Sequence, residues 1–381
     1  MKLLYVIPGL GVGGGAERSL LDLAPGLAAA SIELSILYFH ERPSSAVDRF
    51  RALGVQVDAV QARTWPGRLL AVRRAIARAR PDIVHTTLFE ADVIGRLASL
   101  GLPTKVVSSL VNTSYEPNRR RDPKFSRWRV EVVRMVEACT LRVGCDRVHA
   151  NSWAVARSAT ARLHVPPDRI TVVHRGRNPD ELQPLSAEAR AQVRAELGIR
   201  EGELLVLGVG RHEYPKGHLT LLDALPEVRR AHPNVRVAIA GREGYMTGRI
   251  RASLQWNDLE DVVQLLGHRG DVSRLLGAAD VFAFPSLLEG LPGAVIEAMA
   301  MSVPLVVSDI PPIHELVDEE SAVFVPTEDP QRMAAAIIDV IEDPAAAQER
   351  AAVARQRFLD EFTVAVALEG MVAFYRSVVA P

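Results

Sequence analysis

The chain has 381 residues, of which 48% are hydrophobic, so it can bury the cores of two domains. Its two cysteines, Cys139 and Cys145, are too few for a disulfide framework or a zinc cluster and favour a reducing, cytoplasmic setting. The net charge of −1 conceals an asymmetry, because residues 1–176 carry 26 Lys and Arg against 15 Asp and Glu, whereas residues 177–381 carry 19 against 31.

The first half of the chain alternates short apolar runs with helical patterns. Pro8 and Gly9 interrupt the first apolar run, which is typical of a buried strand rather than a signal peptide, and no run is long enough to span a membrane. Strands are predicted over residues 2–8, 33–39, 55–60, 82–87, 105–110, 147–151 and 170–174. Helices are predicted over residues 16–30, 67–79, 127–143 and 152–163.

The second half repeats this alternation after a linker, which Gly, Asn and Pro residues place at about 174–186. Strands are predicted over residues 204–209, 235–240, 262–266, 281–285, 304–308 and 322–325, and helices over 217–231, 292–301, 330–342 and 345–360. Apolar strands separated by helices indicate parallel sheets covered on both faces. The fold class is therefore α/β, with two Rossmann-like, doubly wound domains facing a central cleft.

A glycine-rich loop follows the first predicted strand. Gly9, Gly11 and Gly14 fit the G-x-G-x-x-G pattern of dinucleotide-binding proteins, and Glu41 follows the second strand, where a ribose-binding acid is expected. This spacing alone is a weak signal, so a nicotinamide oxidoreductase stays open as an alternative.

A second motif lies at residues 284–300. Pro292 is expected to begin a helix, which would leave the backbone N–H groups of Gly293, Ala294 and Val295 open to an anion. Glu289 and Glu297 flank this helix start, and carboxylates can bind the vicinal hydroxyls of a ribose or a hexose. The pair is suited to a nucleotide sugar, although an ordinary capped helix would show the same residues.

Two cations follow the first strand of the second half. Arg211 and Lys216 are expected at the carboxyl-terminal edge of the same sheet, where they would stabilise charge on a departing diphosphate. The sequence has no Asp-x-Asp pair that would hold a divalent metal for this task. We therefore expect neither a metal nor a cofactor.

Four segments together are similar to a known family. They are GGGAERSL at 13–20, VGRHEYPKGHLTLLDAL at 209–225, GHRGDVSRLLGAADVFAFPS at 267–286 and EGLPGAVIEAMA at 289–300, where Glu289 and Glu297 fit an E-x7-E motif. On these segments the chain resembles the retaining glycosyltransferases of family 4, which have the GT-B fold. The resemblance implies that residues 1–175 bind the acceptor, residues 176–361 bind the nucleotide sugar, and a helix within 362–381 returns to the first domain.

The resemblance also implies roles for individual residues. Arg211 and Lys216 would contact the diphosphate, Glu297 the ribose, and Glu289 the donor sugar, which makes Arg211, Lys216 and Glu289 the catalytic candidates. The remaining donor contacts would come from Gly14, Gly15, His268, Arg269, Leu291, Pro292, Gly293 and Ala294. A hexosyl unit would pass from a nucleotide-diphosphate sugar, with UDP favoured over GDP, to an acceptor hydroxyl in glycan, glycolipid or polysaccharide synthesis. A nucleotide-sugar epimerase or sensor on the same fold is the further alternative, and no nucleic-acid partner is expected.

The acceptor side departs from the family pattern. Many relatives have D-x-x-H-x-H, whereas here His85 matches the first histidine and Thr87 replaces the second. Because His85 lies on a buried strand, a core histidine is favoured over a site residue. Asn112, Tyr115 and Arg119 are the other acceptor candidates.

The basic excess of the first half bears on possible partners. The amphipathic run WPGRLLAVRRAIARAR at 65–80 either packs on the sheet or lies on an anionic membrane. Together with the charge asymmetry, it suggests a phosphorylated acceptor or peripheral attachment to the cytoplasmic membrane face.

Overall fold

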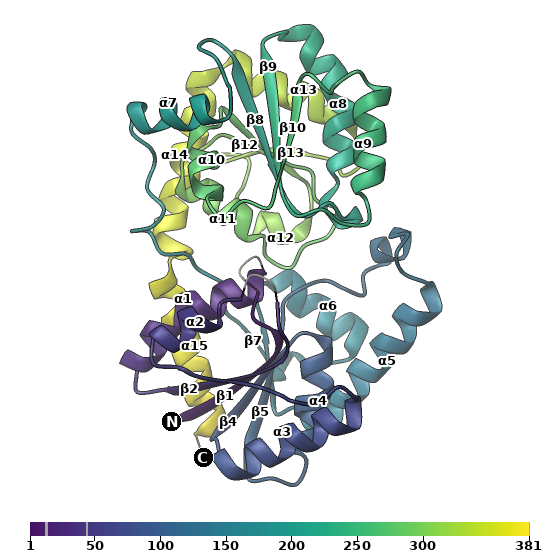
Figure 1. The fold of residues 1–381 in the computed structure, drawn as a ribbon, viewed down its shortest axis with the longest axis vertical. Helices are drawn as coiled ribbons and strands as arrows, with labels where there is room; N and C mark the ends of the chain where they lie inside the picture. Colours follow the sequence, from purple (N-terminus) through teal and green to yellow (C-terminus); the bar gives the residue numbers. More distant parts are fainter. Residues whose placement is uncertain (12–13, 43–44, 381) are drawn as a thin grey trace. The chain divides into compact units, whose positions relative to one another are not determined.

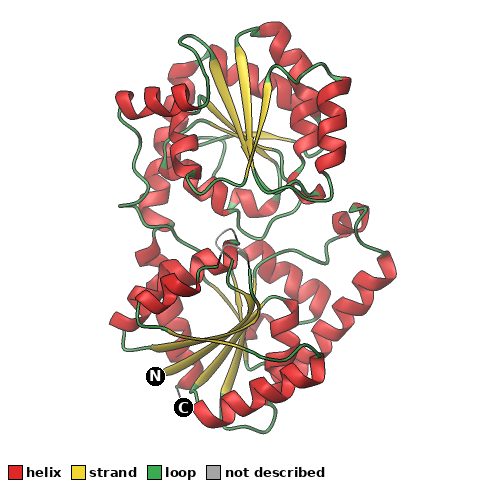
Figure 2. Cartoon of the chain, in the orientation of Figure 1, coloured by secondary structure: helices red, strands yellow, loops and turns green. Residues whose placement is uncertain are grey.

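The computed structural model describes residues 1–11, 14–42 and 45–380, which form two units (Figure 1). Unit 1 comprises Met1–Glu116, Phe125–Arg177 and Thr363–Pro381, and unit 2 comprises Pro117–Lys124 and Asn178–Phe362. Each unit is a parallel sheet flanked by helices (Figure 2), so the predicted α/β class with two doubly wound sheets is confirmed. The grouping of Pro117–Lys124 with unit 2 is not anticipated by the sequence.

Unit 1 contains a seven-stranded sheet of order β3-β2-β1-β4-β5-β6-β7. Its strands are β1 (Lys2–Gly9), β2 (Glu33–His40), β3 (Gln56–Ala59), β4 (Ile83–Thr87), β5 (Lys105–Leu110), β6 (Arg147–Ala150) and β7 (Ile170–Val172). Its helices are α1 (Gly15–Ala29), α2 (Val47–Ala52), α3 (Trp65–Ala79), α4 (Phe89–Ser99), α5 (Arg127–Gly144), α6 (Trp153–Leu163) and α15 (Val364–Val379).

Unit 2 contains a six-stranded sheet of order β10-β9-β8-β11-β12-β13. Its strands are β8 (Leu204–Val209), β9 (Val235–Ala240), β10 (Val263–Gly267), β11 (Val281–Phe284), β12 (Leu305–Ser308) and β13 (Val323–Val325). Its helices are α7 (Ala187–Glu196), α8 (His218–Ala231), α9 (Thr247–Trp256), α10 (Val272–Ala278), α11 (Gly293–Ala300), α12 (Pro311–His314), α13 (Pro330–Glu342) and α14 (Pro344–Glu361).

The buried strands explain why the apolar runs of the sequence are nearly continuous. In β1, Leu3 and Ile7 belong to the core on one face of the sheet, whereas Leu4 and Val6 belong to the core on the other face. Successive side chains of a strand point to opposite faces, and helices cover both, so the strand is apolar after its exposed first residue, Lys2.

A chain of buried hydrogen bonds ties α15 to the sheet of unit 1. His149 Nε2 lies 3.0 Å from the Val173 carbonyl and must donate to it, so His149 Nδ1 accepts from the Ser109 hydroxyl at 2.7 Å. Ser109 then accepts from His85 Nε2 at 2.7 Å, and His85 Nδ1 accepts from the Tyr375 hydroxyl of α15 at 2.7 Å. The chain satisfies both nitrogens of each histidine only while both histidines are neutral.

We predict that this chain of hydrogen bonds makes unit 1 sensitive to acid. Burial lowers the pKa of His149 from 6.5 to about 4, so between these pH values the unfolded chain binds a proton that the folded chain excludes. The free energy of unfolding should therefore fall as the pH drops through this window, by about 3 kcal/mol at most from His149 alone. Denaturant titrations followed by the fluorescence of Trp65, Trp128 and Trp153 in unit 1 measure this change.

A pair of variants isolates the contribution of His149. His149→Gln should reduce the dependence on pH and leave the part that comes from His85, whose pKa burial also lowers, whereas replacing the exposed His164 by Asn should leave the dependence unchanged. If the free energy of unfolding depends on pH equally in the wild type and in His149→Gln, His149 is not a source of the acid sensitivity.

Candidate functional site

The predicted donor residues of unit 2 follow two neighbouring strands. β8 pairs with β11 in parallel, although about 70 residues separate them in sequence, and β9 lies on the other side of β8. The order of the strands reverses at this point, and ligands of doubly wound sheets bind beside such a reversal, at the carboxyl ends of the strands. The loops after β8 and β11 therefore emerge side by side at the edge where a ligand is expected.

Gly217 allows these two loops to cross closely. Its φ is +62°, and a Cβ atom there would lie 1.9 Å from the carbonyl oxygen of Pro285. The Leu287 N–H, in the loop after β11, donates to the carbonyl of Pro215, in the loop after β8, at 2.8 Å. This hydrogen bond holds the two loops together. Only glycine fits this crossing without moving the backbone.

Lys216 is held between the two loops. Its Nζ donates to Glu289 Oε1 at 2.6 Å and lies 5.8 Å from the ring centroid of Phe284. The two side chains are 21% and 11% exposed, so the pair is largely shielded from water. The structure thus brings together two of the three predicted catalytic residues.

Helix α11 begins at this edge. Pro292 is its N-cap rather than its first residue, and the Val295 and Ile296 N–H groups both donate to the Pro292 carbonyl, at 3.2 and 3.3 Å. Val295 is thus not open to an anion as predicted, whereas Gly293 and Ala294 precede the first intrahelical bond. Leu291 and Pro292 are buried beside this helix start.

Other predicted donor residues are more solvated. The Arg211 side chain is 57% exposed and pairs with Glu213 at 3.0 Å, so it does not share the environment of Lys216. His268 is exposed after β10, two strands away from β8, and Arg269 pairs with Asp271 at 2.6 Å, which lowers the pKa of that carboxyl. Glu297 lies half-buried on the second turn of α11.

The described part of the glycine loop in unit 1 leads into α1. Gly14 is the N-cap of α1, and a Cβ on Gly15 would lie 2.7 Å from the guanidinium of Arg175. Residues 12 and 13 of this loop lie outside the described residues.

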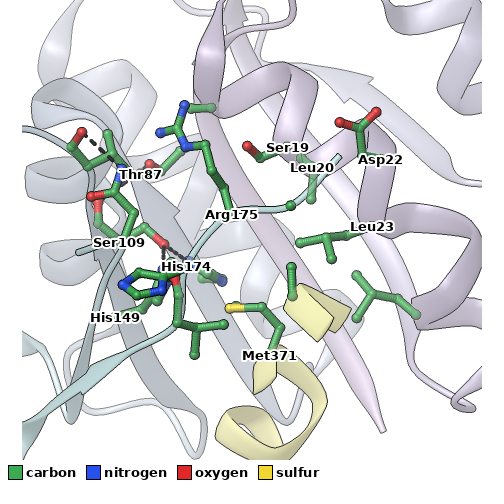
Figure 3. Close-up of a pocket in the computed structure, with 18 of the residues that line it drawn as sticks. Ser19, Leu20, Asp22, Leu23, Thr87, Ser109, His149, His174, Arg175 and Met371 are labelled. Atoms are coloured by element: carbon green, nitrogen blue, oxygen red, sulfur yellow. Dashed lines mark hydrogen bonds between the residues drawn. The ribbon is translucent and has the colours of Figure 1, made fainter. Parts of the chain in front are cut away.

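The predicted acceptor residues separate into three places, which are two cavities of unit 1 and the segment grouped with unit 2. His85 is 1% exposed, and its two ring nitrogens are taken by Tyr375 and Ser109, as in a core histidine. Thr87 is buried and lines a cavity of about 60 Å³ together with Arg175 (Figure 3). His85 lines the same cavity, so these two predicted residues lie together.

The other acceptor candidates lie elsewhere. Asn112 and Tyr115 line a second cavity of about 100 Å³, where the Tyr115 hydroxyl donates to Glu137. Arg119 belongs to the segment grouped with unit 2 and lies 3.6 Å from Asp122. No single acceptor pocket therefore unites the predicted residues within the described part of unit 1.

A buried charged cluster beside the second cavity escaped the sequence analysis. Arg96 is 0% exposed and lies 3.5 Å from Asp92 and 3.8 Å from Glu137, whose pKa burial raises to about 7. The spacing of Asp92 and Arg96 in α4 was the available signal, but an i, i+4 pair is usually a surface feature.

The basic run at 65–80 forms α3, and part of its apolar surface is packed, although Trp65 and Leu70 are 47% and 46% exposed. Val72 and Ile76 are 0% and 2% exposed in the core, with Leu69 packed against them. Of the two interpretations of this run, packing on the sheet is the one that the structure supports. Each helix within the described ranges is too short or too polar to cross a membrane.

Comparisons with known proteins identify the family. A model described as Glycosyltransferase Family 4 matches residues 13–181, and one described as Glycosyl transferases group 1 matches residues 189–357. The chain belongs to the family 4 glycosyltransferases. Membership of this family favours the glycosyltransferase interpretation of the chain over the dinucleotide oxidoreductase alternative.

Individual relatives agree with this family. Glycogen synthase of Mycobacterium tuberculosis is 36% identical over 174 residues, which cover 44% of this chain and 42% of that protein. D-inositol 3-phosphate glycosyltransferase of Segniliparus rotundus is 30% identical over 311 residues, 78% of this chain and 66% of that protein. The chain thus spans less than two thirds of the length of these relatives.

A solved structure shares the fold over its whole length. The crystal structure of Anabaena Alr3699/HepE in complex with UDP superposes with a TM-score of 0.85 at 22% identity, covering 99% of this chain and 100% of that one. This chain therefore has the GT-B fold.

We predict that Gly217→Ala destabilises unit 2 by more than about 3 kcal/mol, because the new Cβ would collide with the Pro285 carbonyl in addition to the cost of the left-handed backbone. Differential scanning calorimetry measures the change. Gly198 is the matched control, since its φ is +72° and open space surrounds it, so Gly198→Ala should cost about 1 kcal/mol. Equal costs would show that the crossing of the loops is not tight.

Proposed function

We propose that the chain transfers a hexosyl unit from a nucleotide-diphosphate sugar to an acceptor hydroxyl, with retention of the anomeric configuration. The observation that carries this proposal is the Lys216–Glu289 pair beside the start of α11. A shielded cation and the amino end of a helix form an anion site, and the carboxylate beside them can accept hydrogen bonds from sugar hydroxyls.

The pair also has an electrostatic purpose. A diphosphate near Glu289 alone would be repelled by the carboxylate, and Lys216 Nζ, 2.6 Å from Glu289, offsets that repulsion. Because the bridge and the loop crossing already hold Lys216 in place, little reorganisation is needed when charge develops on the leaving diphosphate. Glu297, one turn into α11, is assigned to the ribose hydroxyls, and Arg211 to the outer phosphate oxygens.

In the proposed reaction, the bond between the anomeric carbon and the diphosphate oxygen breaks. The acceptor oxygen bonds to the same face of the anomeric carbon, and its proton passes to the departing diphosphate. The products are the glycosylated acceptor and the nucleoside diphosphate, so no protein nucleophile is required. Lys216 stabilises the negative charge that the diphosphate gains.

A uridine nucleotide is the proposed donor class. Its support comes from the resemblance of the fold to Anabaena Alr3699/HepE, whose crystal structures contain UDP or UDP-glucose. A thermal-shift comparison of UDP-glucose with GDP-mannose tests it, because a ligand at about 100 times its Kd adds about 2.7 kcal/mol to stability. A rise in melting temperature with GDP-mannose alone would contradict the choice of uridine as the base, but not the proposed transfer reaction.

Replacing Lys216 by Ala should lower kcat about 100-fold or more, since one fixed charge contact to the leaving group is lost. Glu289→Ala should lower kcat/KM about 10-fold to 100-fold through lost hydrogen bonds to the sugar. Product formation from a radiolabelled sugar nucleotide measures both rates.

Arg190→Ala is the matched control for these two variants. Arg190 forms a 2.6 Å pair with Asp280, which directly precedes β11 at the opposite edge of the sheet. Unchanged transfer in both site variants, with Arg190→Ala equally active, would contradict the catalytic assignment.

The transfer is also proposed to need no metal, because Lys216 and the start of α11 supply the positive charge. Excess EDTA should leave the rate unchanged, and added Mg²⁺ should not raise it. A loss of activity with EDTA that Mg²⁺ restores would contradict this part of the proposal.

A further inference from the structure

Helix α5 turns an apolar face outward. Trp128, Val132, Met135, Val136 and Val143 are 65%, 49%, 55%, 38% and 63% exposed, and Cys139 is exposed as well. Their spacing along the helix places all six on one side, over roughly 100° of arc. We call these six residues the outer stripe. Helices at a protein surface normally show the opposite pattern, with the apolar face toward the core.

The inward face of α5 explains this orientation. Glu137 and Thr140 face the buried Arg96, which lies 3.8 Å from Glu137 and donates to Thr140 at 3.2 Å. Rotating the helix to bury the outer stripe would take Glu137 and Thr140 away from Arg96 and leave Asp92 as the acidic partner of this buried guanidinium. The exposure of the stripe is therefore set by the buried polar cluster.

Positive charges flank the outer stripe. Arg127, Arg129 and Arg142 are exposed on α5, and the Arg129 guanidinium lies 5.5 Å from the ring centroid of Trp128. The helix has two acidic residues, of which Glu137 is buried and Glu131 is paired with Arg134. The outward surface of α5 is consequently apolar along its centre and cationic along its margins.

We propose that the outer stripe docks on an anionic lipid bilayer. Valine, methionine and tryptophan side chains would enter the boundary of the acyl chains, and the flanking arginines would meet lipid phosphates. A tryptophan beside an arginine suits the interface, since its ring is apolar and its N–H is polar. This inference goes beyond the proposed transfer reaction and does not depend on it.

A second copy of the chain fits this surface less well. In a two-fold symmetric contact the same patch faces itself, so the arginines that flank the stripe of one copy would face those of the other, and Glu131, the acidic residue of α5 that is not buried, is already paired with Arg134. An anionic membrane supplies the opposite charge directly.

Flotation of the full chain with vesicles tests the proposal without any sugar nucleotide. The chain should float with vesicles of phosphatidylcholine mixed with phosphatidylglycerol and much less with phosphatidylcholine alone. Val132→Glu combined with Met135→Glu should lower the partition coefficient at least tenfold. Trp65→Glu combined with Leu70→Glu is the matched control, because these residues of α3 are 47% and 46% exposed, and it should float like the wild type.

The arginines give an independent readout. Each of Arg127→Ser and Arg129→Ser should lower binding to the anionic vesicles about fivefold, the equivalent of about 1 kcal/mol per charge near such a surface. Binding to neutral vesicles should not change.

Equal flotation of the wild type and the Glu variant of α5, or equal loss in the α3 control, would overturn the proposal. A dimer in light scattering that the Glu variant of α5 dissociates, without vesicle binding by the wild type, would assign the stripe to contact between copies instead.

The native cysteines provide a test that needs no substitution. Cys139 lies on the outer stripe and Cys145 is buried, so a polarity-sensitive dye should label Cys139. Its emission should shift to the blue with anionic vesicles, and an unchanged spectrum would equally overturn the proposal.

Discussion

The bridge between Lys216 and Glu289 depends on a topological constraint. These residues are 73 positions apart in the chain and meet because β8 and β11 are neighbours in one parallel sheet. Parallel pairing sends both following loops to the same edge, and the glycine at 217 lets the loops approach until a side chain would no longer fit. The charge arrangement at the start of α11 is thus a consequence of strand order rather than of local sequence.

Unit 1 uses buried polar groups in a different way. The chain of neutral histidines beneath α15 and the cluster of Arg96, Asp92 and Glu137 are both inside the protein. Such groups require partners of defined geometry, so they fix how α15 and α5 lie on the sheet. The histidine chain attaches α15 to the sheet, and the cluster around Arg96 determines which side of α5 faces outward.

Strands and the main helices could be predicted because the periodicity of the sequence is set by burial. The continuous apolar runs of β1 and β8 follow from helices on both faces, and the Lys216 and Glu289 positions follow from where β8 and β11 end. The exposure of Arg211 could not be predicted. Strand order places Arg211 at the correct edge of the sheet, but its pairing with Glu213 depends on the conformation of the loop, which the sequence does not reveal. The outer stripe also escaped prediction, since helical periodicity reveals an apolar face but not whether that face is buried.

The attachment of α15 has a consequence for the order in which the protein forms during synthesis. Unit 1 contains residues from both the beginning and the end of the chain, and the hydroxyl that His85 requires comes from Tyr375. Every strand of unit 2 leaves the ribosome before that residue does. The hydrogen-bond chain of unit 1 can therefore be completed only after the whole of unit 2 has been synthesised, although the seven strands of unit 1 precede those of unit 2 in the sequence.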